Sequence, residues 1–160
     1  MTEAKKNCTT PIIIACVDIT NTSSRALRYA CLKAKKMNFA LTILAVMEAS
    51  HKNLMFGSRV IAQDKRQELE KNIKKLTEEI HQTCGIIPVI AVREGEIMTE
   101  IIKEIKDTPR CAMLVLGKSH NALSDNSLLP KVAQKIGNKI KVPVTIVPEN
   151  LSDEFLEKLV

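Results

Sequence analysis

Aromatic side chains are almost missing from this 160-residue chain, which has no tryptophan, one tyrosine and three phenylalanines. Proteins that bind single-stranded nucleic acid stack bases on aromatic rings, so this scarcity argues against that class. No apolar run approaches the roughly 20 residues that a membrane-spanning helix needs. The polar first ten residues are not followed by a secretory signal segment. We therefore expect a cytoplasmic protein that binds neither membranes nor nucleic acid.

Cysteine and histidine do not occur in the spacings that disulfide frameworks or metal sites require. The cysteines are odd in number and none lies in C-x-x-C spacing: Cys8, Cys16, Cys31, Cys84 and Cys111. The histidines share no ligand-like spacing with one another or with a cysteine: His51, His81 and His120. We therefore expect reduced thiols in a cytoplasmic protein, and no bound metal ion.

Glycine is also scarce, and the glycine-rich motifs that bind phosphate are missing. No G-x-G-x-x-G sequence occurs, so there is no dinucleotide-binding fingerprint. Gly117-Lys118-Ser119 matches the end of a phosphate-binding loop, but Ala112 replaces the first glycine of that loop. The residues between them are apolar and predict a strand, whose amides pair with the sheet and cannot surround an anion. We reject this motif.

Positive charge is concentrated in the first half of the chain. The net charge is +6; residues 1–80 contain 14 Lys and Arg against 8 Asp and Glu, whereas residues 81–160 contain 10 of each. No acidic residue lies between Asp18 and Glu48, where five basic residues fall on one side of a predicted helix. A basic face can bind nucleic acid or an acidic partner, but such patterns are more often solvated surface. We favour the solvated surface.

Five short apolar runs alternate with amphipathic segments. The runs predict buried strands, at residues 11–17, 41–47, 86–92, 112–116 and 142–147. The segments predict helices, at residues 26–37, 59–84, 97–105 and 130–140. This alternation predicts one α/β domain whose mainly parallel sheet carries helices on both faces. Residues 151–160 follow as a charged amphipathic tail, for which a helix and a frayed end are both open.

The predicted third helix carries a row of like charges. Its isoleucines and Met98 recur on the inner side, while Glu96, Glu100 and Glu104 share the outer face. Only Glu96, at the amino end, is favoured by the helix dipole. We therefore expect these glutamates on the solvent side of the helix.

Four segments together make the chain resemble the universal stress protein family. They are Val17-Asp18 at the end of the first strand, Arg93-Glu94-Gly95, the run from Met113 to Gly117 and the run from Val142 to Val147. The resemblance covers about residues 11–148. It implies a Rossmann-like fold with a five-stranded parallel sheet of order 3-2-1-4-5, and a cytoplasmic homodimer paired through the last strand. We accordingly divide the chain into a domain at residues 1–148 and a tail at residues 149–160.

The same resemblance locates a nucleotide site in which several expected residues are changed. ATP-binding members carry Gly, two residues, Gly, nine residues, Gly, and then Ser or Thr. Aligned without gaps, these four positions are here Gly117, His120, Pro130 and Lys131. A side chain in place of glycine keeps the backbone away from phosphate, and Pro130 lacks an amide donor. At the nucleoside positions the resemblance places Asp18 and Val46, although Asp18 could equally cap the following helix.

These changes lead to three hypotheses. The first is a non-enzymatic stress-response binding module without catalytic residues or a required cofactor, in which ATP binding is weak or lost. The alternative is an adenine-nucleotide binder that uses Asp18, Val46 and Gly117 on the nucleoside. Lys131 would then hold phosphate as a cation near a helix start; otherwise its ammonium extends into water. The third, slow ATP hydrolysis, lacks an evident base or set of metal ligands. We favour the first.

Overall fold

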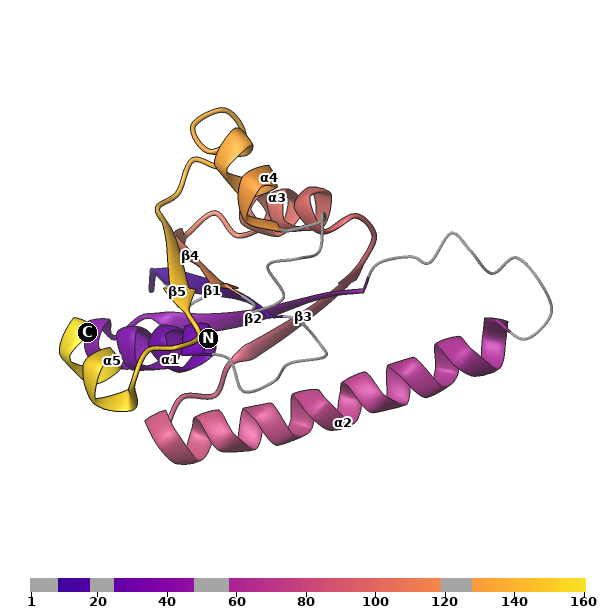
Figure 1. The fold of residues 1–160 in the computed structure, drawn as a ribbon, viewed down its shortest axis with the longest axis horizontal. Coiled ribbons are helices and arrows are strands. Elements are labelled where there is room, and N and C mark those ends of the chain that lie inside the picture. The colour runs from indigo at the N-terminus through magenta and orange to yellow at the C-terminus, as the bar shows by residue number, and fades with distance from the viewer. Residues whose placement is uncertain (1–8, 18–24, 48–57, 119–127) are drawn as a thin grey trace, which may run out of the picture.

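The computed structural model describes residues 9–17, 25–47, 58–118 and 128–160. The described strands form a five-stranded sheet of order β3-β2-β1-β4-β5, in which every pairing is parallel (Figure 1). The strands are β1 (Ile12–Val17), β2 (Ala40–Met47), β3 (Val89–Glu94), β4 (Cys111–Lys118) and β5 (Val144–Pro148). The predicted α/β class and the expected strand order are both confirmed.

Helices alternate with the strands and cover both faces of the sheet. They are α1 (Arg25–Met37), α2 (Ser58–Cys84), α3 (Ile97–Asp107), α4 (Leu128–Lys135) and α5 (Asp153–Leu159). Residues of α1, α2 and α5 form one apolar core with the sheet, and residues of α3 and α4 form a second core on the opposite face (Figure 1). Ile13 belongs to the first core and Ile14 to the second, because successive side chains of a strand point to opposite faces.

The three inner strands carry the most deeply buried side chains. Ile14, Leu44 and Leu114 are each 0% exposed, as expected for parallel strands that helices cover on both sides. The edge strands keep exposed apolar residues, since Val92 of β3 is 46% exposed and Ile146 of β5 is 45% exposed. An edge strand also presents backbone groups that can pair with another chain.

Two helices end at residues in the left-handed region. Asn38, with φ 55°, follows α1, and the N–H of Phe39 donates to the carbonyl of Ala34 at 2.9 Å. Gly85, with φ 69°, follows α2 and donates its N–H to the carbonyl of His81 at 2.9 Å. These are the bonds that close a helix at its carboxyl end, and the predicted stop at Gly85 is confirmed.

The boundaries predicted for the third strand and the fourth helix were wrong. The strand predicted at residues 86–92 is Val89–Glu94 and begins after Pro88, which has no N–H to give to a sheet. The helix predicted at residues 130–140 is Leu128–Lys135. It ends there because Gly137 takes φ 84° and donates its N–H to the carbonyl of Ile140 at 3.0 Å, which turns the chain back on itself.

The prediction that the glutamates of the third helix face solvent was wrong for two of them. Glu100 is 6% exposed and Glu104 9% exposed. Arg93, at the end of β3, lies between them: its Nε is 2.6 Å from Glu104 Oε2 and its Nη1 3.7 Å from Glu100 Oε2. Asp107 and Lys103 complete the cluster. Pairing with Arg93 and Lys103 is what allows the two carboxylates to be buried.

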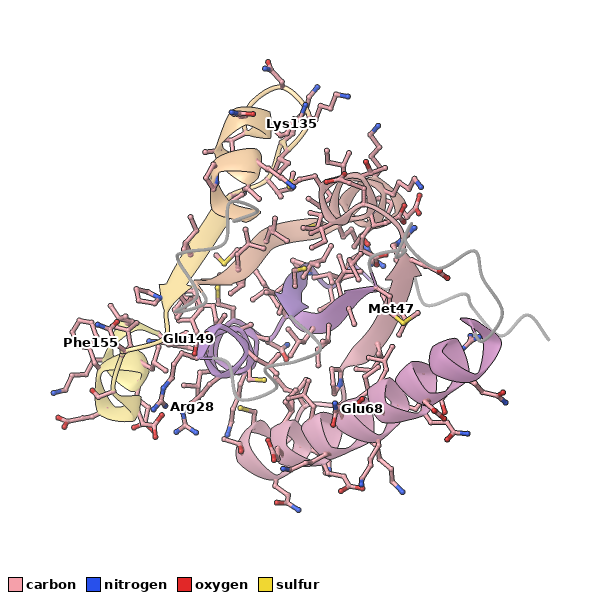
Figure 2. All side chains as sticks on the ribbon, turned by 45° about the vertical axis from the view of Figure 1, so that its right-hand side comes forward. Arg28, Met47, Glu68, Lys135, Glu149 and Phe155 are labelled. Carbon is pink, nitrogen blue, oxygen red and sulfur yellow. The ribbon has the colours of Figure 1, made fainter. Side chains whose placement is uncertain are left out.

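The charged tail is a helix that packs against α1. Ser152 caps α5 by accepting the N–H of Phe155 at 3.2 Å, and Leu156 is 0% exposed within the first core. Asp153 forms an ion pair with Arg25, and Arg28 Nη2 lies 3.3 Å from the Oε1 atom of Glu157. Figure 2 shows Arg28 of α1 beside α5. Two residues of the basic first helix therefore bind acidic groups of the chain itself.

The long helix α2 contacts the sheet through its carboxyl-terminal part. Leu76 and Ile80 are 4% and 5% exposed in the first core, whereas the amino-terminal part of α2 extends past the sheet (Figure 1). This helix has 27 residues, many of them charged. In the described part of the chain, no helix combines the length and the apolar character that crossing a membrane requires.

Candidate functional site

The sheet reverses its chain order between β1 and β4, and open α/β proteins bind ligands in the crevice at the carboxyl ends of such strands. Val46 lies one residue before the end of β2, and Gly117 one residue before the end of β4. Pro130 and Lys131 lie in the first half of α4. The other two predicted site residues, Asp18 and His120, lie outside the described residues.

Val46 and Gly117 face opposite sides of the sheet. The side chain of Val46 is half-buried and packs against the second core, on the side of α3 and α4. A Cβ atom on Gly117 would instead point to α1, where it would meet the Cβ of Ala26 at 3.4 Å. The two predicted nucleoside residues therefore lie on different faces of the sheet.

A carboxylate fills the space next to Gly117. The Oε1 atom of Glu149 would lie 3.2 Å from a Cβ at position 117. Such a contact is tighter than most side chains have, so an alanine here would require the Glu149 carboxylate to shift by a few tenths of an ångström. Gly117 therefore allows Glu149 to approach the end of β4 closely.

Glu149 also satisfies the amino end of α1. Its Oε2 atom accepts the N–H of Arg25, the first residue of that helix, at 3.4 Å (Figure 2). A negative charge at a helix amino end is stabilised by the helix dipole. The first turn of α1 has no acidic residue of its own, so Glu149 supplies that charge from the far end of the sequence.

Lys131 lies beside α3. With Glu96, Thr99 and Ile102 of the α3 region, it lines a cavity of about 230 Å³ between α3 and α4. The nearby Lys131 is one of the groups that lower the pKa of Glu96. The Lys131 and Glu96 side chains therefore line the same cavity.

Glu96 is held as an anion by the start of α3. It is the N-cap of this helix and accepts the N–H of Met98 at 3.2 Å and the N–H and hydroxyl of Thr99, each at 2.8 Å. Burial raises its pKa, but these hydrogen bonds and Lys131 outweigh burial, and the net pKa of Glu96 is lowered. The cavity between α3 and α4 thus contains a carboxylate that stays ionised.

Sequence reasoning missed Glu149 and the cavity that Lys131 shares with Glu96. Both relationships join residues that are distant in the chain, and no local pattern marks either of them. Within the described residues, no group of three or more His, Cys, Asp or Glu side chains is arranged to hold a metal ion.

The comparison with known families agrees with the fold. The model of the Universal stress protein family matches residues 10–148. The chain belongs to the universal stress protein family. A comparison with curated proteins found no matching sequence.

Solved structures of other universal stress proteins share the architecture. UspA from Lactobacillus plantarum superposes with a TM-score of 0.67 at 17% identity, covering 86% of this chain and 97% of that protein. A universal stress protein in complex with cAMP superposes with a TM-score of 0.61 at 16% identity, covering 89% of this chain and 99% of that protein. The universal stress protein from Archaeoglobus fulgidus in complex with dAMP superposes with a TM-score of 0.54 at 16% identity, covering 86% of this chain and 96% of that protein. At these identities the likeness establishes the fold alone.

The match to the family model ends at residue 148, immediately before Glu149. The residue that fills the space beside Gly117 and the helix α5 both lie after this boundary. In this universal stress protein, the segment after the family domain therefore contacts the edge of the sheet where the family's ligand crevice is expected.

Proposed function

We propose that this universal stress protein is a non-enzymatic cytoplasmic binding module of the stress response, in which ATP binding is weak or lost. The observation that carries the proposal is the Glu149 carboxylate, which binds the amino end of α1 and lies against Gly117. A nucleotide entering this crevice would bring several negative charges toward one that is already there.

The electrostatic repulsion between the Glu149 carboxylate and a nearby phosphate is large enough to weaken nucleotide binding. Two unit charges about 6 Å apart at an effective dielectric constant of about 20 repel each other by roughly 3 kcal/mol. About 1.4 kcal/mol corresponds to tenfold in affinity. One carboxylate at this distance would therefore weaken the binding of a singly charged phosphate by roughly a hundredfold, and a triphosphate more.

Two further residues support the proposal. Pro130 lies in the first turn of α4 and has no N–H to offer a phosphate oxygen. Lys131, the cation best placed in sequence to compensate, lines a cavity that also contains the Glu96 carboxylate. This second carboxylate would repel a phosphate that Lys131 attracts.

Calorimetric titration with ATP and Mg²⁺ tests the proposal. We expect no saturable heat at micromolar nucleotide. Clear saturation in the micromolar range would contradict the proposal and would show that the crevice accepts the triphosphate despite Glu149.

An adenine-nucleotide binder is the second candidate. It is favoured by two proteins of the same fold, one in complex with cAMP and one in complex with dAMP, and by the cavity that Lys131 lines. In this case Lys131→Glu abolishes binding of the nucleotide, while Lys106→Glu, at an exposed lysine of α3, leaves it unchanged. Equal affinity of the Lys131 variant and the unaltered protein would remove the role of Lys131.

We also propose a homodimer in which the two β5 strands pair antiparallel across a two-fold axis. β5 is an edge strand with Ile146 exposed, and pairing would cover both its backbone groups and this side chain. Light scattering should give the mass of a dimer for the unaltered chain and of a monomer for Ile146→Lys. Val92→Lys, on the opposite edge, is the matched control and should remain dimeric. A monomeric mass for the unaltered chain would overturn this assembly.

A further inference from the structure

A second cavity of about 230 Å³ lies between α1, α2 and the start of α5. It is lined by apolar side chains of both long helices and by charged groups that include Arg28 and Asp153. None of the predicted nucleotide-site residues Val46, Gly117, Pro130 and Lys131 lines it. The nucleotide hypotheses therefore leave this cavity without a role.

Two cysteine side chains meet in the wall of this cavity. Cys31, in the middle of α1, is 2% exposed, and Cys84, the last residue of α2, is 4% exposed. Both are free thiols and both line the cavity. Both also belong to the apolar core between α1, α2 and the sheet, and Cys84 is close enough to affect the pKa of Cys31. Two thiols from distant parts of the sequence are thus neighbours in the wall of one cavity.

The surroundings keep Cys31 in the thiol form at neutral pH. Burial raises the pKa of Cys31 far above its usual value, the neighbouring Cys84 raises it further, and the opposing effect of Arg28 is smaller. Because the thiolate is the reactive species, the pair resists mild oxidants and requires a higher dose or a higher pH to react.

We propose that Cys31 and Cys84 are an oxidation site that forms an intramolecular disulfide when a peroxide reaches the cavity between α1 and α2. One thiol attacks hydrogen peroxide, breaks the O–O bond and becomes a sulfenic acid, with release of one water. The second thiol attacks this sulfur, the S–S bond forms, and the hydroxyl leaves as a second water with the remaining thiol proton. Two thiols are oxidised by two electrons, and one peroxide is reduced to two waters.

The end of α2 can accommodate the bond. Cys84 is the terminal residue of its helix, and the next residue, Gly85, has φ 69°, a conformation that glycine adopts without strain. We expect a small rotation at Gly85 to bring the Cys84 sulfur to bonding distance of Cys31. The bond would then join the carboxyl end of α2 to the middle of α1.

This bond would stabilise the fold. It closes a loop of about 50 residues, which restricts the unfolded chain. For a domain of this size the restriction corresponds to a rise in the unfolding midpoint of roughly 10 °C. Reduction with dithiothreitol would reverse the rise.

Peptide mapping after treatment with hydrogen peroxide tests the proposal. Trypsin releases Cys31 in residues 29–33 and Cys84 in residues 76–93, each with one cysteine. We expect these two peptides to be linked in the oxidised protein and separate after reduction. The map uses the unaltered chain, so it does not depend on a variant that folds.

Variants identify the sulfur atoms. Cys31→Ser and Cys84→Ser should each abolish the link and the rise in melting temperature, whereas Cys111→Ser should retain both. Linked peptides 29–33 and 76–93 with a raised midpoint support the site. Both peptides unlinked at peroxide doses that oxidise Cys111, or links to other cysteines only, would overturn it and assign the pair to packing.

Discussion

The Oε1 atom of Glu149 lies 3.2 Å from the position that a Cβ on Gly117 would occupy. The first of these residues follows the last strand of the sheet and the second lies near the end of β4. The same carboxylate accepts the N–H of Arg25 at the start of α1. A single side chain thus connects the tail, the sheet and the first helix at the edge where ligands of this fold class bind.

Gly117→Ala should destabilise the protein by about 1 kcal/mol, because the new Cβ displaces the Glu149 carboxylate from α1. Glu149→Ala should cost a similar amount through loss of the charge at the helix amino end. Since both changes remove the same contact, the double variant should cost less than their sum. Urea unfolding of the four proteins measures this, and strict additivity would mean that the two residues do not interact.

Glu149→Gln should increase affinity for adenine nucleotides by at least tenfold, since it removes one negative charge and keeps the shape of the side chain. Titration with AMP and ATP gives the affinities. Glu154→Gln is the matched control, because this exposed carboxylate of α5 pairs with Lys158 and should change neither affinity. Equal affinities for the Glu149 variant and the unaltered protein would remove repulsion as the reason for weak binding.

Arg93→Met should reduce the free energy of unfolding by roughly 3 kcal/mol, because it leaves the buried carboxylate of Glu104 without its ion-pair partner. Glu100 would keep only Lys103. The control is Lys75→Met. Lys75 lies 3.9 Å from Glu79 with both side chains more than half exposed, and its loss should cost less than about 0.5 kcal/mol. Similar losses in urea unfolding for both variants would show that water screens the Arg93 cluster.

The N-cap Glu96 should make the free energy of unfolding depend on pH in the acidic range. Its pKa is lowered in the folded state from the usual 4.5, so its contribution is present above pH 4.5 and is lost as pH falls through the lower folded pKa. Compared with Glu96→Gln, the unaltered protein should be more stable by up to about 1 kcal/mol at pH 7. The difference should shrink toward pH 3; a constant difference between pH 7 and pH 3 would contradict the cap.

The strands, the helices and their order could be predicted because the sequence features that indicate them are either local or shared with a known family. The runs that became β1 and β2 are rich in Ile, Val and Leu, and their observed bounds differ from the predicted ones by one residue. Gly85 marked the end of α2 correctly, since a left-handed residue is a property of one position. Strand order came from the resemblance to the family.

The errors arose where a distant residue decides the environment. Helical spacing put Glu100 and Glu104 on a polar face, but Arg93 from the neighbouring strand makes their burial favourable. Glu149 lies 124 positions from Arg25, and nothing near either residue predicts their contact. Tertiary contacts decide whether a charged side chain is buried and which group it pairs with, and sequence periodicity does not reveal those contacts.

The content of the crevice in purified protein tests the central claim most directly. Protein prepared without added nucleotide is denatured, and adenine nucleotides in the supernatant are measured by chromatography. Because Glu149 and Pro130 oppose phosphate binding, we expect an amount far below one equivalent per chain. Release of close to one equivalent of ATP would contradict the account and identify the protein as a nucleotide carrier.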